Sequence, residues 1–138
     1  QARTDRLVRR LGLDAIADRR VAGFSQGERT KVALARALVH EPRNVILDEP
    51  TNGLDILSTR AVRELVRSLR QEGCCVVFSS HIMQEVSALC DRIVVIAQGT
   101  VVASGTPDAI RQQAGCDDLE DAFVVLTGLN HPDEVERP

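Results

Sequence analysis

The chain has few aromatic residues: they make up 2% of its 138 residues, and tryptophan and tyrosine are absent. Since 43% of the residues are hydrophobic all the same, the core must be built from aliphatic side chains. Lysine is also scarce, with Lys31 as the single example, and the formal net charge is −3 at pH 7. A negative chain of this kind argues against a broad nucleic-acid surface, so we expect no nucleic-acid partner.

Long hydrophobic runs are missing as well. No stretch is long enough to span a bilayer and no signal peptide is present, so we expect that the chain itself does not enter a membrane. The first residue is Gln1 rather than methionine, and the chain begins within helix-like sequence. We therefore expect the 138 residues to be part of a longer protein.

Cysteine pairs with metal-binding spacing are also absent, because none of the four cysteines belongs to a Cys-x-x-Cys motif. Cys74 and Cys75 are neighbours in an apolar run, where successive side chains of a strand point to opposite faces. Together with Cys90 and Cys116 they are predicted to be buried, reduced thiols and not metal ligands.

Periodic apolar residues predict an α/β fold with parallel strands and flanking helices. A wholly apolar strand at 45–47, predicted to be buried on both faces, a helix at 58–72 and a second strand at 74–80 form a βαβ unit. A polar tail at 129–138 is predicted to be disordered. Further helices are predicted at 4–12, 25–40, 83–90, 107–114 and 117–127, with a short helix or turn at 13–22 and a β-hairpin at 92–105.

Two of the predicted helices begin with a capping box, a polar residue followed three positions later by an acid. Ser25 and Glu28 form the first, and Asp117 and Glu120 form the second. The residues predicted to face inward from the helix after Ser25 are Val32, Ala35, Leu38 and Val39.

Acidic side chains follow directly after the first predicted strand. Asp48 and Glu49 end this strand, and His81 follows the second one. Ligands of open parallel sheets bind beyond the carboxyl ends of the strands, so these three side chains should share one edge. Two acids and an imidazole suit a reaction of Mg²⁺ with a phosphate, in which Asp48 faces the metal and Glu49 faces an attacking water.

Each of these residues also has a purely structural interpretation. A strand-end aspartate often caps a turn, and a lone histidine such as His81 is more often a hydrogen-bonded structural residue. Asp55 can simply be the N-cap of the next helix, and Ser25 with Glu28 can be a capping box without a ligand. Taken one at a time, the structural interpretation is favoured for each.

The four motifs taken in order resemble the ATP-binding subunit of ABC transporters. The stretch "FSQGE" (24–28) is similar to the signature motif of that family, and "NVILDE" (44–49) to its Walker B strand with the catalytic glutamate. "TNGLD" (51–55) resembles the D-loop, and "SSH" (79–81) the switch-histidine segment. The resemblance covers about residues 4–127 and is strongest toward bacterial exporter-type subunits, including those of sodium efflux and drug resistance.

This resemblance implies a role for each matched residue. Glu49 and His81 would be catalytic, and Asp48 would hold the metal. The residues implied in nucleotide binding are Ser25, Gln26, Gly27, Glu28 and Asp55. The family usually has glycine where Gln26 stands, glutamine where Glu28 stands and proline where Ile56 stands. Glu28 adds a negative charge to the first helical turn, which stabilises the helix and slightly disfavours phosphate.

A phosphate-binding loop of the pattern G-x-x-x-x-G-K-[ST] is absent from the 138 residues. Because the family places that loop before the signature, we expect a partial P-loop NTPase fold that corresponds to the C-terminal portion of a nucleotide-binding domain. The expected divisions are the end of a helical subdomain with the signature helix (1–40), part of the catalytic core (41–105), C-terminal helices (106–128) and the tail (129–138).

The resemblance also implies cofactors, partners and a location. ATP and Mg²⁺ would be bound, a second nucleotide-binding subunit would complete a homodimer, and a membrane-spanning permease would hold the pair at the cytoplasmic face of the cell membrane. Two alternatives stay open: a soluble ABC-type ATPase of translation or DNA repair, and a non-catalytic remnant that only binds a partner.

Overall fold

The computed structural model describes residues 2–129, and the chain divides into two compact units between His81 and Ile82. The tail predicted at 129–138 lies outside the described residues, apart from Leu129. Each unit is described by itself. All helices in the described part of the chain are too short or too polar to span a bilayer.

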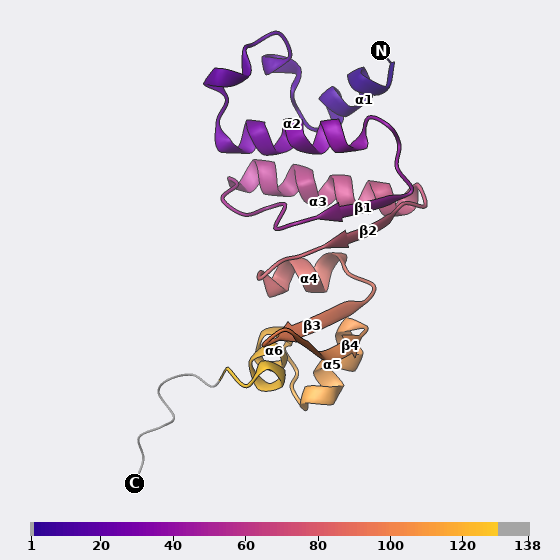
Figure 1. Cartoon of the computed structure of the whole chain (residues 1–138), viewed down its shortest axis with the longest axis vertical. Helices are drawn as coiled ribbons and strands as arrows, with labels where there is room; N and C mark the ends of the chain where they lie inside the picture. The colour runs from indigo at the N-terminus through magenta and orange to yellow at the C-terminus, as the bar shows by residue number, and fades with distance from the viewer. Residues whose placement is uncertain (1, 130–138) are drawn as a thin grey trace. The chain divides into compact units, whose positions relative to one another are not determined.

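The first unit is a stack of helices on a small parallel sheet (Figure 1). Helix α1 packs on α2, α2 packs on α3, and α3 packs on β2. Strands β1 and β2 are parallel, in a register that pairs Asn44 with Cys75 and Leu47 with Phe78. This confirms the predicted βαβ unit. The elements are α1 (Ala2–Arg10), the short 3-10 helices η1 (Asp14–Ile16) and η2 (Val21–Gly23), α2 (Gln26–Leu38), β1 (Asn44–Leu47), α3 (Ile56–Gln71) and β2 (Cys75–Phe78).

The inward face of α2 was predicted only in part. Leu38 is buried as expected, whereas Val32, Ala35 and Val39 are half-buried and Leu34 is buried instead. The face of α2 is shared between α1 and α3, so a stripe toward one neighbour describes it incompletely. The prediction for α3 was confirmed, because all the apolar residues of its expected stripe are buried: Val62, Leu65, Val66 and Leu69.

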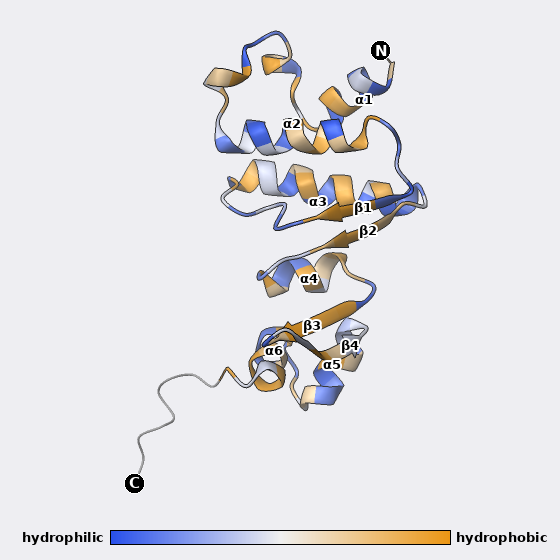
Figure 2. Ribbon diagram, in the orientation of Figure 1, coloured by the Kyte–Doolittle hydropathy of each residue, from blue (hydrophilic) through white to orange (hydrophobic). Residues whose placement is uncertain are grey.

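The prediction that the first strand is buried on both faces was wrong. Val45 and Leu47 are buried, but Ile46 is 82% exposed and Val77 on the paired strand is 58% exposed. Apart from Asn44, both strands consist of apolar residues (Figure 2), so composition alone does not distinguish the two faces. Within the first unit, helix α3 packs on this two-stranded sheet, and Ile46 and Val77 stay exposed.

The second unit is an antiparallel hairpin packed with three helices, and its predicted elements were confirmed. The turn at Gln98 and Gly99 has φ values of 50° and 76°, the left-handed region that tight hairpin turns require. The core of this unit consists of Val86, Val95, Ala103, Ile110, Leu119 and Ala122. Its elements are α4 (Met83–Leu89), β3 (Ile93–Ala97), β4 (Thr100–Gly105), α5 (Pro107–Ala114) and α6 (Leu119–Thr127).

Two further predictions for local structure need correction. The N-cap of α6 is Asp118, whose carboxylate accepts from the backbone N–H of Glu120, so the capping box expected from Asp117 does not form. All four cysteines are free, as predicted, but they are not fully buried: Cys75 is exposed and the other three are half-buried. Cys75 lies on the exposed side of the same small sheet as Val77.

Candidate active site

The strand ends bring Asp48, Glu49 and His81 together, as their order in the chain predicts. His81 Nδ1 lies 3.0 Å from Glu49 Oε2, across 32 residues of sequence. When Nδ1 carries the proton it donates to the carboxylate, which holds the glutamate side chain in one orientation. The His81 side chain is 67% exposed and that of Glu49 is 32% exposed, so the pair lies on an accessible surface.

Ser79 joins the two adjacent acids. Its hydroxyl donates to Asp48 Oδ1 at 2.6 Å and accepts from the backbone N–H of Glu49 at 2.8 Å. The backbone N–H of Ser79 donates to Leu47 O at 2.9 Å and continues the sheet pairing up to this point. A single hydroxyl therefore links Asp48 and Glu49, and through Glu49 it is connected to His81.

Glu49 has an unusual backbone for a residue with a side chain, with a φ of 43°. This left-handed conformation is sparsely populated outside glycine and asparagine, and it costs about 1–3 kcal/mol. The carbonyl of Glu49 accepts from the backbone N–H of Asn52 at 3.1 Å, which starts the turn after the strand. The left-handed residue redirects the chain at the strand end, where strain often accompanies function.

The start of α2 carries the predicted capping box in full. The Glu28 N–H donates to Ser25 Oγ at 3.2 Å, and the Ser25 N–H donates to Glu28 Oε2 at 2.7 Å. Arg19 lies 3.6 Å from the other carboxylate oxygen of Glu28. The negative charge that Glu28 adds to this helix start is therefore partly balanced by an arginine. Gln26 is exposed at the first position of the helix.

Gly27 places the start of α2 beside the start of α3. A Cβ added to Gly27 would lie 3.1 Å from Ser58 Oγ and 3.4 Å from Asp55 Oδ2. Asp55 is the N-cap of α3 and accepts from both the backbone N–H and the hydroxyl of Ser58, at 2.9 Å and 2.7 Å. The Ser58 hydroxyl is the main cause that lowers the pKa of the Asp55 carboxyl below its ordinary value. The predicted signature and D-loop segments thus lie close together.

The residues present fit a magnesium ion held jointly with a bound phosphate. Among residues 2–129, no group of three or more His, Cys, Asp or Glu side chains could hold a metal alone. Mg²⁺ commonly takes one or two carboxylates and completes its shell with water and substrate phosphates. Asp48 is an exposed carboxylate at the sheet edge, so it could supply one of the few protein ligands that Mg²⁺ needs.

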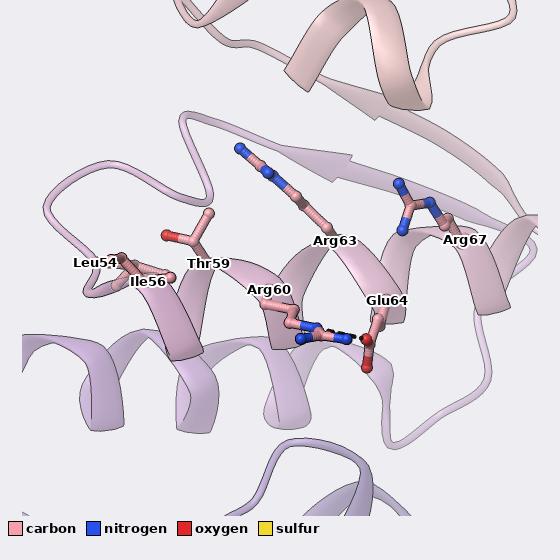
Figure 3. A pocket seen from close by; sticks show the side chains of 7 residues that line it. All are labelled: Leu54, Ile56, Thr59, Arg60, Arg63, Glu64 and Arg67. Carbon is pink, nitrogen blue, oxygen red and sulfur yellow. Dashed lines mark hydrogen bonds and ion pairs between the residues drawn. The ribbon is translucent and has the colours of Figure 1, made fainter. Parts of the chain in front are cut away.

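A separate open hollow of about 530 Å³ lies along α3, and none of the predicted catalytic or metal residues lines it. Figure 3 shows Arg60 paired with Glu64 at 3.2 Å, while Arg63 and Arg67 extend to the other side of the helix in this view. The hollow is rich in arginine and open to solvent. Ligands of parallel sheets bind beyond the strand ends, where Asp48, Glu49 and His81 lie. The acidic cluster is therefore a better candidate for a reaction centre than this hollow.

Comparisons with known proteins agree with these motifs. Residues 1–52 match the family described as ABC transporter. The chain is 44% identical over 124 residues to the ABC transporter ATP-binding protein NatA of Bacillus subtilis, covering 90% of this chain and 50% of that protein. The chain belongs to the ABC transporter ATP-binding proteins.

Other members of the family give the same result. The Nod factor export ATP-binding protein I of Rhizobium johnstonii is 42% identical over 109 residues, which cover 78% of this chain and 35% of that protein. A solved structure titled "Structure of ATP binding subunit of ABC transporter" matches with a TM-score of 0.82 and 34% identity, over 92% of this chain and 55% of the other. The α/β fold is thus that of an ABC ATPase subunit. The chain spans about half the length of NatA.

Two polar residues of the site were not predicted from the sequence as site residues: Ser79 and Ser58. Ser79 belongs to the "SSH" segment, but that segment gives no sign that the Ser79 hydroxyl bonds to both Asp48 and Glu49. Ser58 follows Asp55 by three positions, the spacing at which an N-cap carboxylate meets a backbone N–H, so its contact could have been found. The hydrogen bond from the Ser58 hydroxyl to Asp55 depends on the side-chain rotamer of Ser58, which the sequence does not show.

Proposed function

We propose that this chain supplies the water-activating residues and the signature motif of an ABC transporter ATPase. The observation that carries the proposal is the hydrogen-bonded cluster of Asp48, Ser79, Glu49 and His81 at the carboxyl ends of two parallel strands. Parallel sheets bind their ligands at this edge. Family membership supports ATP as the ligand.

The proposal gives each side chain of the cluster a role. Glu49 acts as the general base and takes a proton from the attacking water. This role requires the water to lie within hydrogen-bond reach of the Glu49 carboxylate. His81 holds the Glu49 carboxylate through their 3.0 Å contact. Asp48 provides a carboxylate for Mg²⁺, which supplies charge stabilisation at the phosphates when it is bound.

The start of α2 serves as an anion site in the same proposal. Backbone N–H groups at a helix N-terminus favour phosphate, and Gly27 permits close approach of a ligand to the backbone. Ser25, Gln26, Gly27 and Glu28 would contact ATP held by a second copy of the subunit, and Asp55 supports this segment from the start of α3. The phosphate-binding loop absent from these 138 residues would belong to a longer parent protein.

The longer parent would work with a membrane-spanning permease. Conformational closure of two ATP-binding subunits would drive the permease, and the subunits would lie at the cytoplasmic face of the membrane. Relatives named as export proteins support an exporter. The divisions expected from the motifs, with the signature helix in 1–40 and the catalytic core portion in 41–105, remain part of this proposal.

Substitutions in the intact parent protein test the catalytic assignment. Glu49→Gln should lower steady-state ATP hydrolysis about 10²–10⁴-fold, the range typical of a general base. His81→Ala should lower it as well, and Asp48→Asn should raise the Mg²⁺ concentration needed for half-maximal rate. Glu64→Gln is the matched control, because Glu64 is an exposed glutamate whose partner is Arg60.

The control should keep the wild-type rate. Wild-type turnover by Glu49→Gln would show that Glu49 is only a turn residue, and the proposal would fail.

A further inference from the structure

We propose that Ser79 is a positioning residue that holds Asp48 and Glu49 in their working arrangement, an inference that rests on the proposed function of this site. The Ser79 hydroxyl contacts both acidic residues, through the Asp48 carboxylate at 2.6 Å and the Glu49 backbone N–H at 2.8 Å. Because these bonds share one oxygen atom, the placement of one acid depends on that of the other.

The direction of both hydrogen bonds is fixed by their chemistry. A serine hydroxyl has one proton to donate and lone pairs to accept with. A backbone N–H can only donate and an ionised carboxylate can only accept, so the proton of Ser79 goes to Asp48 and a lone pair receives the Glu49 N–H. Bonds to an ionised acceptor are shorter and stronger than neutral ones.

Glu49 needs this support because its backbone is left-handed, with a φ of 43°. Two hydrogen bonds fix the peptide groups on either side of it: its N–H donates to Ser79, and its carbonyl accepts from Asn52. The side chain is held separately by His81. Loss of the Ser79 hydroxyl would release the peptide group between Asp48 and Glu49, and would also free the Asp48 carboxylate.

The position of Ser79 itself is set by the sheet and not by a flexible loop. Its backbone N–H donates to Leu47 O at 2.9 Å, directly after the paired residues Leu47 and Phe78. The hydroxyl therefore has a defined place at the strand end. Since Ser79, Asp48 and His81 are all exposed, their bonds add little to global stability, and variants at Ser79 should fold.

An isosteric pair of variants in the intact parent separates positioning from packing. Ser79→Thr keeps the hydroxyl, Ser79→Val replaces it with a methyl group, and both residues suit a strand. Ser68→Ala is the matched control, because the Ser68 hydroxyl also joins two side chains, accepting from Arg10 and donating to Glu72, away from the acidic cluster.

The first measurement needs no nucleotide. Hydrogen–deuterium exchange of peptides that contain the Glu49 amide should be faster in Ser79→Val than in wild type, and close to wild type in Ser79→Thr and Ser68→Ala. The second is ATP hydrolysis: Ser79→Val should lower kcat about 10- to 100-fold, as expected for misplaced reacting groups, and raise the Mg²⁺ concentration for half-maximal rate. Ser79→Thr should restore both values.

The outcomes distinguish this inference from the proposed function. Wild-type hydrolysis by Glu49→Gln would refute the function. If Glu49→Gln is inactive but Ser79→Val matches Ser79→Thr in exchange and in rate, the positioning role is refuted. Failure of Ser79→Val to fold, with Ser79→Thr folded, would make Ser79 a structural residue and would equally refute the role. Slower turnover with an unchanged Mg²⁺ requirement and unchanged exchange would do the same.

Discussion

Gly27 lies where the first turns of α2 and α3 meet, and a side chain there would be tightly crowded. A Cβ there would come within 3.1 Å of the Ser58 hydroxyl, and Ser58 is itself buried. The absence of a side chain thus allows close packing between the two helix starts. The predicted signature segment and the predicted D-loop segment therefore lie next to each other at this residue.

Gly27→Asp should destabilise the fold by about 1–3 kcal/mol, the usual cost of forcing extra atoms into a packed contact. The new carboxylate would also lie beside that of Asp55, and this repulsion outweighs the small benefit of an acid near a helix N-terminus. Urea unfolding measures the change. Ala33→Asp, at an exposed position of the same helix, should shift the midpoint much less, and equal shifts would contradict the packing account.

At the residue scale, strand order was enough to group Asp48, Glu49 and His81, because side chains after parallel strands meet at one edge. It was not enough to find Ser79, because the sequence does not show that one hydroxyl reaches both the Asp48 carboxylate and the Glu49 N–H. The exposure of Ile46 could not be predicted either, because the sequence of an apolar strand does not show which of its faces is covered.

Among the elements, α3 has the best-defined beginning. Asp55 accepts two hydrogen bonds from Ser58, and these lower the pKa of its carboxyl. A carboxyl with a lowered folded pKa stabilises the fold fully above its ordinary pKa of 3.8, and the contribution is lost as the pH falls through the folded pKa. The cap of α3 is thus a source of acid sensitivity below about pH 4.

Asp55→Asn tests this sensitivity, since asparagine remains a good N-cap but carries no charge. The urea midpoint of wild type should exceed that of Asp55→Asn by a constant margin from pH 7 to pH 5. The margin should narrow below pH 4, where the wild-type carboxyl takes up its proton. A margin that is independent of pH would show that the charge of Asp55 adds nothing to the cap.

Most elements were predictable because their end signals are local. Capping residues and glycines mark where α2, α3 and α5 begin or end, and these bounds agree within a few residues. The N-cap of α6 was misplaced by one residue because two adjacent acids, Asp117 and Asp118, can each serve as the cap. The pattern of acids alone cannot decide which of them has the extended backbone of an N-cap.

In the proposed function, two copies of the subunit would form shared ATP sites. A mixing experiment on the intact parent tests this: one copy carries Gly27→Asp and the other carries Glu49→Gln. If α2 acts on the partner's ATP, both defects fall in one site and the other site stays intact. Mixed dimers should then regain part of the hydrolysis that each variant alone has lost.

If α2 instead served the ATP of its own subunit, each site of the mixed dimer would contain one defect. No recovery should appear, although the mixed dimers form. Differently tagged copies, purified through both tags, establish that the dimers measured are mixed. Inactive mixed dimers of folded subunits would count against the shared-site arrangement.

The proposed activation of the attacking water by Glu49 is tested most directly by identifying the nucleotide that stays bound to the protein. The intact parent is incubated with Mg²⁺ and labelled ATP, freed of excess nucleotide, and its bound nucleotide is separated and identified. Wild type should retain mainly ADP, whereas Glu49→Gln should retain mainly unhydrolysed ATP. Bound ADP in Glu49→Gln, at the wild-type proportion, would contradict the account.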